Sequence, residues 1–187
     1  MATGGPPGEA YGEAVEHWTA EAHVYHVFDR ILDVAATYQS PTFRKERTLH
    51  WAKLAGLSRA EVESLLAREQ AEATQEIDFF VGLSADPPKY NDLDQRHGIW
   101  RPTLVTEDGR AIAPLLVRLY ASPDPNLRAL YPYLRDFWVG YLLRFPGRDA
   151  LGRPIAGPDT RRLTLRLASA PARVDLVFLL PRAAASR

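Results

Sequence analysis

The stretch WTAEAHVYHVF, residues 18–28, decides the fold because two classes of side chain alternate along it. One parity carries Trp18, Ala20, Ala22, Val24, His26 and Phe28, and the other carries Thr19, Glu21, His23 and Tyr25. Neighbouring side chains of a strand point to opposite faces of a sheet, so this alternation predicts antiparallel strands with one buried face. The alternation continues to Tyr38, and we expect two strands joined near Asp29.

Other stretches extend the same pattern. Residues 136–145 predict a central strand, whose shared face carries Phe137, Val139, Tyr141, Leu143 and Phe145. The segments 99–106 and 111–120 flank Asp108-Gly109, which supplies the positive φ angles of a hairpin turn. Pro102 and Pro114 each remove a backbone donor and indicate a sheet edge or a bulge. In a last hairpin, inward side chains form two facing rows: Leu163, Leu165 and Leu167 against Val174, Leu176, Phe178 and Leu180.

A helical hairpin interrupts these strands at about residues 41–75. Ser40 before Pro41 is typical of a helix N-cap, and Gly56 ends that helix. Ser58 and Glu61 match a capping box, which predicts a second helix. With about eight strands separated by turn signals, we expect a mainly β (α+β) chain, an antiparallel immunoglobulin-like β-sandwich with this insertion.

The length of 187 residues suits a single domain. Residues 1–15 are expected to be a flexible N-terminal tether, because the first eight are small and rich in glycine and proline. The sandwich domain is expected over residues 16–182, and residues 183–187 are expected to be a C-terminal tail.

Composition narrows the function classes. The 23 lysines and arginines balance 23 aspartates and glutamates, so no overall positive field attracts nucleic acid, and a protein is the expected partner. The chain has no cysteine, which excludes disulfides, thiolate metal sites and a cysteine nucleophile. No run approaches the roughly eighteen apolar residues of a spanning helix, so we expect no transmembrane segment.

Short catalytic and phosphate-binding motifs are missing from the sequence, so we expect no catalytic residue, no metal and no cofactor. His23 and His26 point to opposite faces of a strand and cannot share a metal. The loop after residue 85 offers oxygen ligands for calcium, but it lacks the glycine and distal glutamate of an EF-hand. As binding residues we nominate Asn91, Asp92, Asp94, His97, Tyr131 and Tyr133.

Two alternatives stay open. An enzyme would use Asp92, Asp94 or His97 as an acid or base in a cleft, which requires these side chains to converge. A DNA-binding protein would use residues 52–66, which match a helix-turn-helix pattern around Gly56. The second helix of that pattern carries more glutamates than arginines, and phosphates would repel it.

Five segments carry a resemblance to known sequences: ATYQSPTFRK ending at Lys45, FFVGLSADPPKYNDLD (79–94), IWRPTL (99–104), ALYPYL (129–134) and YLLRFP (141–146). Together they resemble a family of uncharacterised bacterial proteins labelled as lipoproteins. The resemblance implies a β-rich body in the cell envelope or periplasm, and no activity or functional residue. It also implies membrane tethering if the natural protein carries an upstream lipidated cysteine. A native start at Met1 would instead favour a cytoplasmic location.

These observations favour a non-catalytic binding or structural module of the bacterial cell envelope. Neutral charge, the missing motifs and the sandwich pattern are its basis.

Overall fold

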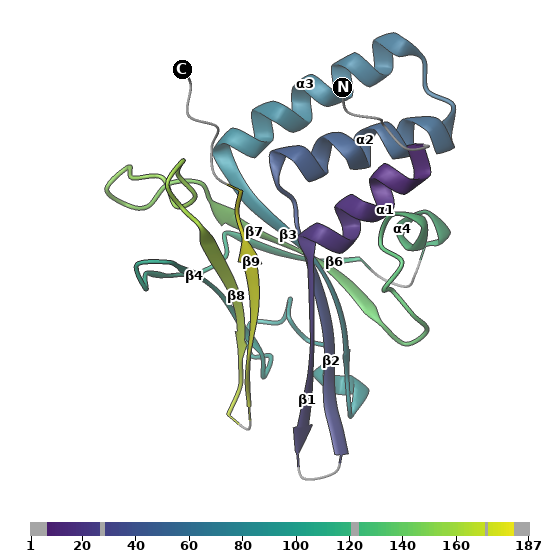
Figure 1. Cartoon of the computed structure of the whole chain (residues 1–187). Helices are drawn as coiled ribbons and strands as arrows, with labels where there is room; N and C mark the ends of the chain where they lie inside the picture. Colours follow the sequence, from purple (N-terminus) through teal and green to yellow (C-terminus); the bar gives the residue numbers. More distant parts are fainter. Residues whose placement is uncertain (1–6, 27–28, 121–123, 171, 182–187) are drawn as a thin grey trace.

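The computed structural model describes residues 7–26, 29–120, 124–170 and 172–181. Within these ranges the chain is mainly β, with nine strands in two antiparallel sheets and four α-helices (Figure 1). The predicted α+β class and the helical insertion are therefore confirmed. Phe28 and the tail predicted at residues 183–187 lie outside the described residues.

The larger sheet has the strand order β1-β2-β3-β7-β6. Its strands are β1 (Thr19–His26), β2 (Asp29–Tyr38), β3 (Glu76–Ala85), β7 (Val139–Pro146) and β6 (Leu116–Tyr120). β1 and β2 are the two strands predicted from the alternating stretch. Along β1, Ala20, Ala22 and Val24 pack against the core, while Glu21 and His23 are exposed.

The smaller sheet has the order β5-β4-β8-β9. Its strands are β5 (Ala111–Ile112), β4 (Arg101–Thr106), β8 (Arg162–Ala168) and β9 (Arg173–Leu179). The predicted last hairpin is confirmed, since the inward leucines of β8 and the inward side chains of β9 are buried.

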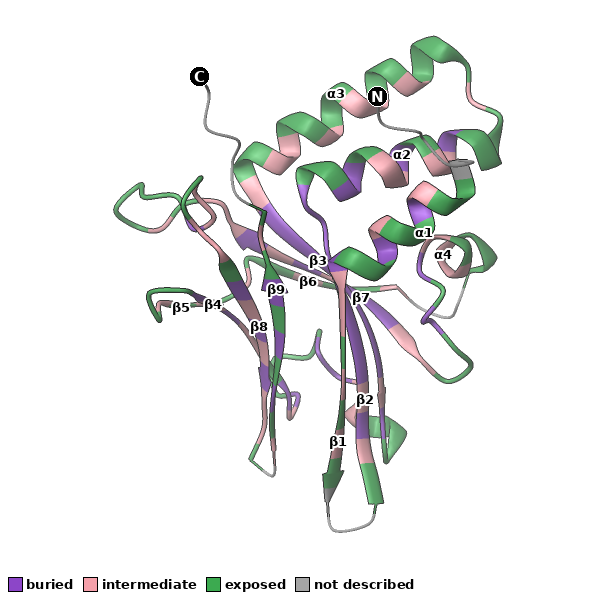
Figure 2. Cartoon of the chain, viewed as in Figure 1, coloured by how far each residue is buried: buried purple, intermediate pink, exposed green. Residues whose placement is uncertain are grey.

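The two sheets pack through apolar side chains, and the buried residues follow the strands in Figure 2. Phe79 of β3 contacts Phe145 of β7 and, across the interface, Phe178 of β9, with ring centroids 5.9 and 5.0 Å apart. Tyr141 and Leu143 of β7 are fully buried on the same face. β7 lies between β3 and β6, which confirms the predicted inner strand.

Helices lie against the other face of the larger sheet. They are α1 (Pro7–Trp18), α2 (Pro41–Ala55), α3 (Arg59–Gln75) and α4 (Pro125–Leu130), and a short 3-10 turn η1 covers Pro88–Tyr90. α2 begins at Ser40, whose hydroxyl accepts a bond from the Phe43 amide, and it ends at Gly56 with a left-handed φ of 64°. α3 begins with the predicted capping box of Ser58 and Glu61.

The N-terminal tether predicted over residues 1–15 is wrong from residue 7 onward, because Pro7–Trp18 forms α1. Tyr11, Val15 and Trp18 follow one another at helical spacing and are buried. Trp18, expected in the first strand, is instead the last residue of this helix and packs edge-on against Tyr38. The glycines and prolines that suggested a tether precede this apolar stripe.

Two strand predictions also need correction. The segment 111–120 is not one strand: β5 pairs with β4, whereas β6 crosses to the larger sheet. Pro114 lies at the break, where its missing N–H interrupts a ladder. Phe137 is not on the buried face, since it precedes β7, has a φ of 68° and is 89% exposed.

Candidate functional site

A buried ion pair joins the first turn of α2 to the start of β3. Arg44 Nη2 donates to Asp78 Oδ2 at 2.7 Å, and both side chains are only 3% exposed. The positive end of the helix dipole disfavours an arginine in the first turn of a helix. Arg44 therefore depends on its acceptors, which also include the Gln39 carbonyl at 3.0 Å.

Asp78 also receives a second guanidinium. Arg144 lies directly opposite Asp78 in the β3–β7 register and binds both carboxylate oxygens at 2.9 Å. Its Nη1 lies 2.7 Å from Glu76 Oε2. The hydrogen bond to Asp78 raises the pKa of Arg144, which stays a cation. One carboxylate thus connects α2, β3 and β7.

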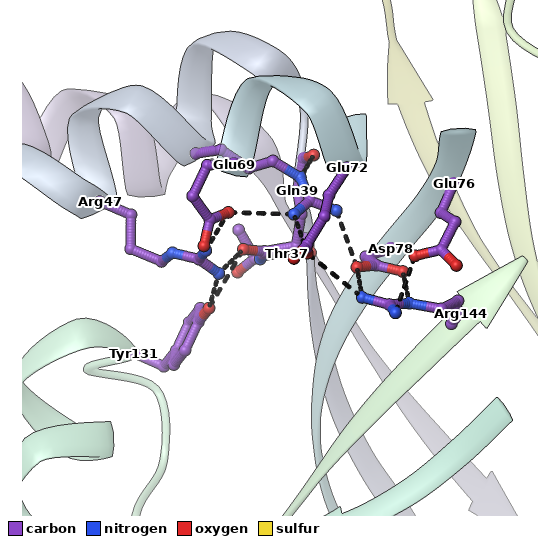
Figure 3. Close-up of polar contacts among 10 residues, drawn as sticks. Thr37, Gln39, Arg47, Glu69, Glu72, Glu76, Asp78, Tyr131 and Arg144 are labelled. Atoms are coloured by element: carbon purple, nitrogen blue, oxygen red, sulfur yellow. Dashed lines mark hydrogen bonds and ion pairs between the residues drawn. The ribbon is translucent and has the colours of Figure 1, made fainter. Parts of the chain in front are cut away.

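Glu69 of α3 likewise pairs with two arginines, both from α2. Its Oε2 accepts from Arg44 Nη1 at 3.0 Å and from Arg47 Nη2 at 2.6 Å. Figure 3 shows Arg47 reaching down between Glu69 and Tyr131. Arg47 also donates to Gln39 Oε1 at 2.6 Å, and the Tyr131 hydroxyl donates to the same oxygen at 3.2 Å.

The cations of this network are held in their charged form. Burial by itself lowers the pKa of Arg47, but Tyr131 and Glu69 outweigh it and raise that pKa overall. Burial raises the pKa of Tyr131, so its hydroxyl keeps the proton that it donates. The carboxylates of Glu69 and Asp78 each accept from two guanidiniums, an arrangement that fixes the hairpin to the sheet and leaves neither of them free as a general base.

A cavity of about 280 Å³ opens beside this network. It is lined by Arg44, Arg47, Glu69, Glu72, Asp78, Phe80, Arg118, Tyr120, Leu127, Leu130, Tyr131, Leu142 and Arg144. Four arginines face three carboxylates, so the lining carries one excess positive charge. The lining residues come from α2, α3 and α4 and from strands β3, β6 and β7, with Tyr131 directly after α4.

Arg118 of β6 supplies the excess charge. Its guanidinium lies over the Tyr120 ring, 4.7 Å from the centroid, and it donates to the Tyr120 hydroxyl. Among the described residues no carboxylate lies within ion-pair distance of it. An incoming carboxylate would therefore meet a cation that is already positioned.

β6 is also an open edge of the larger sheet. Within the described ranges it pairs with β7 and with no second strand. Leu115, Leu116 and Leu119 are 64%, 41% and 42% exposed. At the opposite edge of the larger sheet β1 lies close to β9, and in the smaller sheet the edge strand β5 has two residues.

The nominated loop residues do not converge on this site. Asp92 is buried and its Oδ2 accepts from the Ile99 amide at 2.9 Å, while Asn91 Oδ1 accepts from the Ala85 amide at 2.7 Å. These two side chains hold the loop in shape. Asp94 and His97 are exposed and do not line the 280 Å³ cavity.

The nominated tyrosines lie at the helix-facing side of the sheet. Tyr131 lines the 280 Å³ cavity and stacks on Phe80 with centroids 3.8 Å apart. Tyr133 is buried beside it, and its hydroxyl donates to the Phe80 carbonyl at 3.0 Å and contacts Thr37 Oγ1 at 2.9 Å. Tyr131 is therefore the one nominated residue in the cavity lining.

Sequence reasoning missed the charged residues of the site. Asp78 stands in the apolar run IDFFVGLS and Arg144 in YLLRFP, where a lone charge among buried side chains is a signal of pairing. Arg44, Arg47 and Glu69 carry no such signal, because helix surfaces normally hold charges.

The α2–α3 hairpin does not have the geometry that the DNA-binding alternative requires. α2 and α3 lie side by side and run in opposite directions (Figure 1). A helix-turn-helix crosses its helices at about 90–120°. Residues 52–66 form the turn of this hairpin, and the exposed Arg59 there is paired with Glu63 at 2.8 Å.

In the described part of the chain, no group of three or more His, Cys, Asp or Glu side chains is arranged to hold a metal ion. No helix among those residues has the length and apolar character needed to cross a bilayer.

Comparison with known proteins gives no relative: no family model, no curated protein and no solved structure matches the chain.

Proposed function

We propose that this protein is a non-catalytic binding module that takes up an extended segment of a partner protein along β6. The open edge of β6 carries the proposal. An edge strand presents unpaired N–H and C=O groups, and strand addition is a common way to satisfy them with a peptide. Natural sheets usually protect such edges, and at the opposite edge of this sheet β1 lies close to β9.

The side chains of β6 define the chemistry of the partner. Val117 and Leu119 lie opposite Leu143 and Tyr141, on the face toward the second sheet. Leu116, Arg118 and Tyr120 lie on the helix-facing side, beside the charged cavity. A complementary strand is apolar on the first face and carries an acidic side chain near Arg118 on the second.

A different protein fits this edge better than a second copy. Arg118 is the middle residue of β6, and symmetric antiparallel pairing centred there would set two Arg118 guanidiniums opposite each other. Like charges in directly opposite positions destabilise a sheet. An acidic partner strand turns that same position into an attraction.

The proposal also covers the cellular location of the protein and the class of its β-sandwich. The resemblance to lipoprotein-labelled bacterial proteins supports a role in the cell envelope, and the alternating strand pattern supports an immunoglobulin-like sandwich. Fractionation of cells that express the natural gene would test the location, because a cytoplasmic protein would contradict it.

Peptide selection tests the binding proposal. A display library of ten-residue peptides should yield sequences that alternate apolar and acidic residues, with affinities measured by fluorescence anisotropy. Leu119→Lys places a charge on the edge and should weaken binding about tenfold or more. Leu54→Lys is the matched control, since Leu54 is 55% exposed at the far end of α2, and should bind like wild type.

A charge reversal sharpens the test. Arg118→Glu should shift the selected peptides from acidic to basic residues. Selection of no peptide, or equal loss in the Leu54→Lys control, would contradict the proposal.

A further inference from the structure

A second cavity, of about 450 Å³, lies between α2, α3 and α4 and shares part of its lining with the first cavity. Each helix contributes three lining residues, two of which lie three positions apart: Thr48 and Trp51 in α2, Leu65 and Arg68 in α3, and Leu127 and Leu130 in α4. Side chains three residues apart share one face of a helix, so three helix faces converge on this space. Its volume falls within the roughly 300–1,000 Å³ of small-molecule sites.

From this lining we infer that the cavity binds an amphipathic carboxylate, a small molecule with an apolar body and one carboxylate group. The body is matched by Trp51, Leu65, Leu127 and Leu130, which are all partly exposed and line the same space. Covering them removes apolar surface from water, which is worth about 25 cal/mol for each Å².

The carboxylate is matched by Arg68. This side chain is exposed at the cavity, and no acidic group among the described residues lies within ion-pair distance of it. The other charges in the lining are engaged. Arg47 and Glu69 bind each other at 2.6 Å, and Asp124 caps α4 by accepting from the Asn126 amide at 2.9 Å.

Arg68 therefore selects the ligand class. A carboxylate gains one charge-assisted hydrogen bond with Arg68, whereas the lining carboxylate outside an ion pair, Asp124, already caps α4. A neutral ligand gains only the apolar contacts. Of the β6 residues only Tyr120 lines this space, and neither Arg68 nor the apolar side chains that match the ligand belong to β6, so the inference goes beyond the proposed function.

Binding of decanoate to the full chain tests the inference, with decanamide as the neutral analogue and both below their micelle concentrations. Isothermal titration calorimetry should give decanoate a Kd about tenfold lower than that of decanamide, the effect of one charge-assisted bond. Arg68→Gln should remove this preference while leaving decanamide binding unchanged. Arg59→Gln is the control on the same helix, because Arg59 does not line the cavity, and it should keep the preference.

Tryptophan fluorescence locates the ligand. Trp51 is one of four tryptophans, and Trp51→Phe should abolish a decanoate-dependent emission change that the wild type shows. Equal affinity for decanoate and decanamide, an unchanged preference in Arg68→Gln, or no binding at millimolar concentration would overturn the inference. Each of these results leaves peptide binding at β6 unaffected, so failure here is distinct from failure of the proposed function.

Discussion

The two faces of the larger sheet differ in chemistry although the same strands form both. Toward the second sheet, β3 presents Ile77, Phe79, Val81 and Leu83, which are all buried and apolar. Toward the helices, the alternate residues are Asp78, Phe80 and Gly82, and β7 places Arg144 directly opposite Asp78. One strand therefore carries a dry core on one side and buried charges on the other.

The two faces differ in how strictly each one fixes the partners of its side chains. Apolar contacts are non-directional, so the core face tolerates any well-packed side chains of similar volume. The helix-facing side depends on fixed partners: Arg44, Arg144 and Asp78 come from three elements and must meet in one geometry. The cavities lie on this helix-facing side, and the outer edge of strand β6 is open to a further strand.

The largest effect is expected from Asp78→Ala on the helix-facing side. The change leaves the buried guanidinium of Arg44 without its closest carboxylate and removes both bonds of Arg144 to Asp78. Breaking a buried pair by removing one partner costs about 3–5 kcal/mol, and weakening the pairing of two cations at once places this variant near the upper end, although Arg44 keeps Glu69 and Arg144 keeps Glu76. Urea unfolding followed by circular dichroism measures the loss.

A double variant distinguishes charge pairing from packing at this position. Replacing both partners, as Arg44→Met with Asp78→Leu, should recover much of that loss, because no buried charge then lacks a partner at this point. A double variant as unstable as Asp78→Ala would show that the ion pair stabilises the fold by more than the neutralisation of two buried charges.

On the core face, Phe79→Ala should cost about 3–5 kcal/mol, the usual range for an aromatic residue truncated in a packed core. The cost is cavity formation among Phe145, Phe178 and Tyr38, which surround the ring. No second substitution that removes a charge should rescue it. The unfolding midpoint of Phe79→Ala should also be insensitive to salt, in contrast to that of Asp78→Ala.

A smaller effect is expected from Tyr133→Phe, which removes one hydroxyl from the helix-facing side. The hydroxyl bonds the Phe80 carbonyl and Thr37, and such a hydrogen bond is worth about 0.5–1.5 kcal/mol net. The substitution keeps the ring, which packs closely against Gly82: a Cβ added to Gly82 would lie 3.0 Å from it. Repeating the substitution in a Thr37→Val background should give a smaller change, and equal changes in both backgrounds would show that Thr37 is not coupled to Tyr133.

The core face could be predicted from the sequence and the helix-facing side could not. Side chains that alternate along residues 19–38 and 163–180 of the sequence mark strands locally, and helix caps at Ser40 and Ser58 mark the insertion. The pairing of Asp78 with Arg144 depends on the β3–β7 register, across 66 positions of chain, and no local pattern determines it. The same holds for the switch of sheet between β5 and β6, which creates the open edge.

The smallest expected effect concerns pH and the attachment of α1 to the helical layer. His50 of α2 stacks on Tyr11 of α1, with ring centroids 4.2 Å apart. Burial, and then the charge of Lys53, lower the pKa of His50 below its ordinary value. The folded chain therefore binds this proton less tightly than the unfolded chain, whose histidine pKa is about 6.5.

The sign of the effect follows from that difference. The contribution of His50 to stability is complete above pH of about 6.5 and is lost as the pH falls through the lower folded-state pKa. His50→Gln should remove this part of the pH dependence between pH 5 and 7.5, and Lys53→Gln should reduce it. An NMR titration of His50 gives the direct measurement, and a midpoint at or above about 6.5 would contradict the prediction. The contrast between the two faces then extends to solvent conditions, because protonation loosens a contact in the helical layer and leaves the packing of Phe79 against Phe178 intact.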